Sequence, residues 1–211
     1  MAANFIGQFV TILSVNKTRT LDGRFASIFC RMGTGVPIFL FGGSMNKTKH
    51  LVHGAMIAAL YAVLTHTQNM ILPETASFAI QFRASEALCV LAFFTPAAIP
   101  GLTVGCLVFN LTFAGALPLD WLVGSLATLT AAWGMRHTRG ILFKNLPVPG
   151  LLMPAVTNAV LVGWELSVYV GGGFWVNALC VALGELGVLF TLGALLYRVM
   201  KKQRLDLILF G

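Results

Sequence analysis

Charged side chains are scarce in this chain. Asp, Glu, Lys and Arg make up 10% of its 211 residues, against about 25% in soluble domains. Hydrophobic residues make up 57%, and the mean hydropathy is +0.85. This composition excludes an ordinary soluble domain and indicates a membrane protein with several spanning helices. The length allows about six helices of ~20 residues with short connections, so we expect one domain.

Cysteine is also rare, and familiar catalytic motifs are missing. The four cysteines show no CxxC spacing and three of them lie in apolar runs, so we expect small buried side chains, no disulfide and no metal site; they are Cys30, Cys89, Cys106 and Cys180. The sequence contains no Walker A, GxSxG or HExxH motif. We therefore expect no enzyme activity and no cofactor.

Basic residues lie mostly near the two ends. The net charge is +7, yet the only Lys and Arg residues between positions 50 and 197 are Arg83, Arg136, Arg139 and Lys144. This placement is typical of charges that flank and orient membrane helices. It does not resemble the continuous basic stripe of a nucleic-acid-binding surface.

Six apolar stretches predict spanning helices. They run over about 51–72, 81–95, 97–114, 119–135, 150–170 and 174–198, with prolines next to several of the ends. With six spans, the basic segments 47–49, 136–144 and 198–204 all fall on one side, which is then the cytoplasmic side. We therefore predict a multi-pass, all-α protein of the cell membrane with both termini inside. Residues 45–204 form the six-helix domain and 205–211 a C-terminal tail.

The first 44 residues differ from the rest. Their apolar part at 36–41 is too short to span a membrane, and it does not resemble a cleavable signal peptide. The run Met45-Asn46-Lys47-Thr48-Lys49 resembles a natural start. We expect residues 1–44 to be an upstream extension of the reading frame or a loosely held cytoplasmic arm. An interfacial helix is the alternative.

Ionisable side chains inside the apolar stretches indicate a binding site. Arg83 and Glu86 stand three residues apart, on one face of a helix. A charge at the centre of a bilayer costs about 3 kcal/mol on insertion scales, so it rarely occurs without a partner or a function. A structural ion pair joining two helices is the alternative to the polar wall of a ligand site.

Further polar residues fall at similar depth. In the six-span arrangement Glu74, Glu86, Asp120 and Glu165 lie in the outer half, and Glu185 lies near the middle of its helix. Asn158 is two helical turns from Glu165, on the same stripe. Convergence of these groups beside Arg83 predicts a pocket open to the outside, with further polar groups from Asn110 and Asn177.

Tryptophans and small residues mark two other surfaces. Trp121, Trp164 and Trp175 fall at the outer ends of their helices, where they form either a stacking wall for a flat ring or an interfacial aromatic belt. On the first helix, Ala55 with Ala59 and Ala58 with Ala62 are spaced four apart, so that another helix can approach closely; ordinary internal packing is the alternative.

Five stretches closely resemble the QueT family, the substrate-binding S components of energy-coupling factor (ECF) transporters for queuosine precursors. They are AMIAALYAVLT (55–65), QFRASEAL (81–88), PGLTVGCLVFN (100–110), DWLVGSLATLTAA (120–132) and FWVNALCVALGELGV (174–188). The resemblance covers about 47–202. It implies a six-helix S component with a ligand site near the outer face. It also implies contact of Ala55, Ala58, Ala59 and Ala62 with a T component, and two cytoplasmic ATPases as further partners.

The resemblance implies a deazaguanine ligand such as queuine or its aminomethyl precursor. A carboxylate suits the N–H edge of such a base, with Glu165 as first and Glu185 as second choice. The ring carbonyl needs a donor from Asn158, Asn177 or Arg83. Glu86 or Asp120 suits a cationic side arm, and Trp121 or Trp164 suits the ring face. The rival interpretations are a proton-coupled carrier or membrane enzyme that uses Arg83, Glu86 and Glu165, and a purely structural subunit without a ligand.

Overall fold

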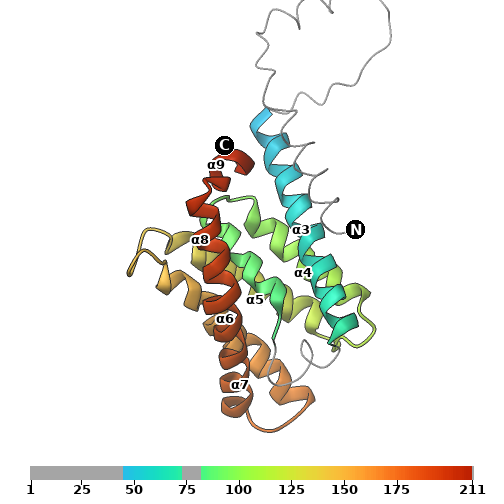
Figure 1. Cartoon of the computed structure of the whole chain (residues 1–211). Coiled ribbons are helices and arrows are strands. Elements are labelled where there is room, and N and C mark those ends of the chain that lie inside the picture. The colour runs from blue at the N-terminus through green and yellow to red at the C-terminus, as the bar shows by residue number, and fades with distance from the viewer. Residues whose placement is uncertain (1–44, 73–81, 211) are drawn as a thin grey trace, which may run out of the picture. The chain divides into compact units, whose positions relative to one another are not determined.

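The described part of the chain is helical (Figure 1). The computed structural model describes residues 45–72 and 82–210. Our expectations for residues 1–44 and for Glu74 therefore lie outside the described residues. The elements are α3 (Met45–Ile71), η2 (Ala84–Phe93), α4 (Ala98–Thr112), α5 (Asp120–His137), α6 (Val148–Tyr169), α7 (Phe174–Val188), η3 (Leu189–Gly193), α8 (Ala194–Lys202) and α9 (Leu205–Phe210).

Proline and glycine set the ends of several helices, close to the positions that the sequence predicts. Pro149 lies in the first turn of α6, where its missing N–H is no loss. After α6, Gly171, Gly172 and Gly173 have φ angles of +84°, +84° and +83°, a backbone conformation that glycine adopts without strain. This turn lets α7 begin at once and pack back against α6. The all-α prediction is confirmed for residues 45–72 and 82–210.

The second apolar stretch differs from the regular spanning helix that we predict over 81–95. It is the ten-residue 3₁₀ segment η2, preceded by Arg83 in an extended conformation. At about 2.0 Å per residue, η2 is ~20 Å long, which is shorter than the ~30 Å hydrocarbon layer. All of its residues except Ala84 are buried, and it lies between α3 and α8 (Figure 1). Protein therefore surrounds this segment, and lipid does not.

The core of the bundle forms around η2. Leu88, Val90 and Phe93 pack in one buried cluster with side chains from other helices, including Leu102 of α4 and Leu151 of α6. At the end of η2 the guanidinium of Arg136 donates to the backbone carbonyls of Ala92 and Phe93, both at 3.3 Å. A 3₁₀ helix leaves carbonyls at its end without internal partners, and Arg136 supplies the donor.

Two helices of the described part are long and apolar enough to cross a membrane. These are α6, with 22 residues, and the continuous helix Phe174–Lys202, with 29 residues, formed by α7, η3 and α8. Within the latter, η3 is a π-helical turn. Many large apolar side chains face outward on α3, α6 and α7, among them Leu60, Val156 and Leu183, as expected for a surface that contacts lipid. The six-span topology and its orientation stay predictions.

Helices α3 and α4 approach at the level of their backbones. A Cβ atom at Gly101 would lie 2.6 Å from the carbonyl oxygen of Gly54, and one at Gly105 would lie 2.7 Å from that of Ala58. Only glycine allows so short a separation, which is how small residues bring membrane helices together.

The four alanines of α3 lie at the boundary between its buried and its exposed side. Ala58 packs against Gly105 and Ala62 is buried, whereas Ala55 and Ala59 are exposed. Positions three or four apart share a face, so the four alanines lie within an arc of about 100° around the helix. Contact of all four with a T component stays a prediction.

Candidate functional site

Four carboxyl side chains from different helices surround one guanidinium. Glu86 comes from η2, Asp120 from the start of α5, Glu165 from α6 and Glu185 from α7; we call these four the carboxylate cluster. The three glutamates are at most 1% exposed, and Arg83 is 9% exposed. Arg83 interacts electrostatically with Glu86 and Asp120, and it also acts on Glu165 and Glu185. Burial weakens solvent screening, so these interactions are strong.

Glu86 has protein partners for both of its oxygens. The phenol of Tyr61 donates to Oε1 at 2.6 Å, and the Cys89 thiol donates to Oε2 at 3.1 Å. This pattern joins α3 to η2 and holds the Glu86 carboxylate in one position. It is the arrangement expected of a buried structural acid next to Arg83.

Only one of the two carboxylate oxygens of Glu185 has a hydrogen-bond partner in the described part of the chain. The side-chain amide of Asn158 donates to its Oε1 at 2.8 Å, while Oε2 has no hydrogen-bond partner among the residues that the structure describes. Asn158 lies on the same stripe of α6 as Glu165, as predicted, but its amide nitrogen binds Glu185. Asn158 and Glu185 therefore act as one unit that leaves a single carboxylate oxygen available.

Glu165 is the most unusual member of the carboxylate cluster. It is completely buried, and neither carboxylate oxygen has a hydrogen-bond donor within the described part of the chain. Asp120 acts on it closely, but two ionised carboxylates are both acceptors and cannot satisfy one another. A buried charged group without a donor costs several kcal/mol. Such an arrangement is stable only with a proton or with a donor brought by a ligand.

Three of the predicted site residues make contacts that hold the backbone. The amide of Asn110 donates to the Asp120 carbonyl at 2.7 Å, and Oδ2 of Asp120 accepts the backbone N–H of Leu117 at 2.7 Å. The amide of Asn177 donates to the carbonyl of Gly171 at 2.7 Å, which fixes the glycine turn. These contacts give Asn110 and Asn177 structural tasks, and their ligand roles stay predictions.

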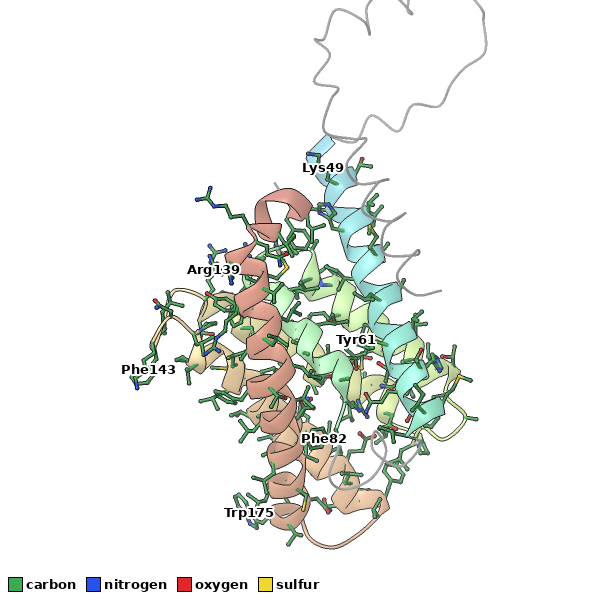
Figure 2. All side chains as sticks on the ribbon, viewed as in Figure 1. Lys49, Tyr61, Phe82, Arg139, Phe143 and Trp175 are labelled. Carbon is green, nitrogen blue, oxygen red and sulfur yellow. The ribbon has the colours of Figure 1, made fainter. Side chains whose placement is uncertain are left out.

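The tryptophan side chains are exposed, in contrast to the buried acids. Trp121 and Trp164 are 46% and 49% exposed, and Trp175 is 82% exposed. Figure 2 shows Trp175 at the end of the bundle opposite to Lys49. These positions suit the interfacial aromatic belt, and the stacking role of Trp121 and Trp164 stays a prediction.

Sequence reasoning missed Tyr61. This side chain is fully buried part way along α3 (Figure 2), where it donates to Glu86. A usable signal was present, because a tyrosine in the middle of an apolar helix must find a hydrogen-bond partner for its hydroxyl. The partner itself, 25 residues away in the chain, could not be read from spacing.

Tyr61→Phe tests the Tyr61–Glu86 contact. We expect a loss of about 1–3 kcal/mol of stability, since the substitution leaves a buried carboxylate oxygen without its donor. Thermal unfolding of the full chain in detergent measures the effect, with Tyr169→Phe at a 40% exposed position as the matched control. Equal melting temperatures for the two variants would contradict the contact.

Comparison with known proteins supplies the family. A sequence profile of the QueT transporter family matches residues 51–202. The "Queuosine precursor transporter QueT" of Lactococcus lactis subsp. cremoris (strain MG1363) is 40% identical over 85 residues, which are 40% of this chain and 47% of the relative. The chain thus spans about half the length of the curated relative it matches. No solved structure matches. Because the profile covers most of the chain, this protein belongs to the QueT transporter family.

Proposed function

We propose that this protein is the substrate-binding S component of an ECF-type importer and that it binds a queuosine precursor from the outer side of the cell membrane. The observation that carries the proposal is Glu165, a buried carboxylate without a donor in the described part of the chain. Family membership supports transport in place of catalysis, and the name of the Lactococcus relative supports a queuosine precursor as the ligand.

The chemistry of a 7-deazaguanine base matches the available oxygens. A guanine-like edge carries adjacent ring and amino N–H groups, which a carboxylate accepts as a charge-assisted pair. In the proposal Glu165 takes this edge. The unpartnered Oε2 of Glu185 accepts a further donor from the ligand. A base without these donors leaves buried oxygens unpaired, which is how such a site rejects related bases.

Charge balance favours a ligand that carries an amine. The carboxylate cluster has four acidic groups around Arg83, and an aminomethyl arm adds a cation that offsets part of this excess. Queuine carries a secondary amine and the aminomethyl base carries a primary amine. Both amines are protonated at neutral pH, so both ligands remain in the proposal. We assign the cationic arm to Asp120, because both oxygens of Glu86 already have donors.

Partners supply the energy in this proposal. A T component and two cytoplasmic ATPases drive transport, and the six helices place both termini inside. We assign the T-component contact to the outward-facing side of α3, where Ala55 and Ala59 lie beside Met56, Leu60 and Val63. Small residues in an apolar surface allow another helix to approach closely.

A proton-coupled carrier is the second candidate, because an unpartnered buried carboxylate beside Asp120 can also hold a proton. The two candidates differ in their energy source. A carrier takes up the base when this chain is present alone in proteoliposomes with a proton gradient. An S component binds the base alone but transports it only with its partners and ATP.

The decisive experiment combines binding and uptake. Calorimetry of the full purified chain is expected to show binding of 7-aminomethyl-7-deazaguanine but not of guanine. Native mass spectrometry checks for a base that co-purifies with the protein. Uptake in proteoliposomes is expected only when the T component and ATPases are present with ATP. Absence of binding to any 7-deazaguanine base would overturn the proposed ligand, and uptake by the chain alone would overturn the S-component role.

A matched pair of alanines on α3 tests the docking face. Ala59→Trp is expected to leave base binding intact but to reduce ATP-driven uptake at least tenfold, because the bulky ring prevents close helix approach at an exposed position. Ala58→Trp is expected to destabilise the protein itself, since Ala58 packs against Gly105. Full uptake by Ala59→Trp would show that the partner docks elsewhere.

A further inference from the structure

A cavity lies at the end of the bundle that carries Lys49. Its volume is about 170 Å³, and it is lined by Lys49, His50, His53, Phe94, Thr95, Pro96 and Phe210. On α3, His53 is eight residues before Tyr61, which corresponds to about 12 Å along the helix axis. The cavity is therefore separate from the carboxylate cluster that Tyr61 contacts, and the function proposed above makes no use of it.

The polar wall of this cavity is basic. Lys49 and His50 are exposed, so the cavity opens to the surface, and both act electrostatically on the half-buried His53. The Lys201 ammonium, 5.7 Å above the Phe94 ring, adds positive charge next to the wall. Among the side chains that the structure describes, no Asp or Glu lines the cavity. Several donors without an acid to neutralise them suit an anion.

The remaining lining of the cavity is apolar. Phe94, Pro96 and Phe210 line it, and the Phe210 ring contacts His53 edge to face at a centroid distance of 5.3 Å. A site for a small hydrated anion has no use for such a wall, because aromatic rings cannot replace its water. An anionic group attached to hydrocarbon fits both walls at once.

The position of the cavity along the helices also supports an anionic group attached to hydrocarbon as its ligand. Lys49 and Arg139 lie toward the same end of the bundle, away from Trp175 (Figure 2). Basic residues and aromatic rings at a helix end are typical of the headgroup layer, and basic pockets between membrane helices on the cytoplasmic side take anionic headgroups.

We propose that this cavity binds the phosphate of an anionic phospholipid from the cytoplasmic leaflet. Lys49, His50 and His53 hold the phosphate, the Thr95 hydroxyl can donate a further hydrogen bond, and Phe94 with Phe210 covers the start of the lipid chains. The proposal rests on the membrane placement proposed above, but not on the identity of the transported base.

Native mass spectrometry of the full chain, titrated with defined lipids, tests this site. Phosphatidylglycerol is expected to bind at least fivefold more tightly than phosphatidylcholine. The double variant Lys49→Gln/His53→Gln is expected to weaken phosphatidylglycerol binding at least fivefold. Lys49→Gln alone, at an exposed position, is expected to give part of that loss without disturbing the fold. The matched control Arg139→Gln/Lys144→Gln removes two charges from an exposed loop and is expected to change affinity less than twofold.

Each of three results would overturn the lipid site. The first is an equal loss in the loop control, which would reduce the effect to general attraction between charges. The second is displacement of phosphatidylglycerol by millimolar inorganic phosphate, which would make the cavity a site for soluble anions. Binding of the deazaguanine base is measured on the same samples. Retained base binding with no preference for phosphatidylglycerol rejects this inference and leaves the proposed function standing.

Discussion

Glu165→Gln is expected to weaken binding of a 7-deazaguanine base at least tenfold and to make the ligand-free protein more stable. The loss of affinity follows because hydrogen bonds to a charged group contribute about 1.5–3 kcal/mol, and ~1.4 kcal/mol is a factor of ten. The gain in stability follows because the carboxylate has no donor in the described part of the chain. A glutamine amide can instead donate to the neighbouring Asp120.

The opposite signs of these two effects separate a binding residue from a structural one. Calorimetry in detergent gives the affinity, and thermal unfolding without ligand gives the stability. Glu86→Gln is the comparison, because its oxygens already have donors in Tyr61 and Cys89; we expect this variant to be less stable than the wild type. If Glu165→Gln kept the wild-type affinity, Glu165 would have no part in the site.

Gly105→Leu is expected to separate α3 from α4 and to destabilise the protein. Even a Cβ atom at this position would lie 2.7 Å from the Ala58 carbonyl oxygen and 2.8 Å from the Tyr61 Cβ. Neither backbone nor Cβ can rotate away, so the helices must separate. Overpacking of this kind costs about 1–3 kcal/mol for modest insertions, and we expect about 3 kcal/mol or more for leucine. Displacement of α3 also removes Tyr61 from Glu86, so base binding is expected to fall with stability.

A graded series gives the test its control. Gly105→Ala is expected to fall between wild type and Gly105→Leu in thermal unfolding. Gly140→Leu should behave as wild type, because a Cβ at Gly140 meets nothing within 4 Å. A wild-type melting temperature for Gly105→Leu would mean that the two helices are not in backbone contact.

Local features of the sequence account for much of the fold. The predicted stretch 119–135 is close to α5 (Asp120–His137), and 97–114 is close to α4 (Ala98–Thr112). Apolar runs and their flanking Pro and Gly residues carry this information, because they act through the backbone of a few neighbouring residues. The 3₁₀ form of η2 was not predictable, since burial on all sides by other helices decides it.

The candidate site, like the fold, could be predicted from the sequence only in part. A carboxylate in an apolar run is visible in the sequence because burying it needs a reason, and Glu86, Glu165 and Glu185 come together in the structure. The donor for each acid is a tertiary contact. Spacing could therefore not reveal that Tyr61 binds Glu86 or that Asn158 binds Glu185. Which residues of α3 are buried likewise depends on where α4 packs.

The π-helical turn of η3 decides which way the last long helix presents its side chains. Tyr197 follows Glu185 by twelve residues, and an unbroken α-helix would put them about 120° apart in azimuth. A π turn winds less per residue, so the five residues Leu189–Gly193 absorb most of that offset. Both side chains are consequently buried, at 1% and 6% exposure. The same helix can thus point Glu185 and Tyr197 toward the interior of the bundle at two different depths.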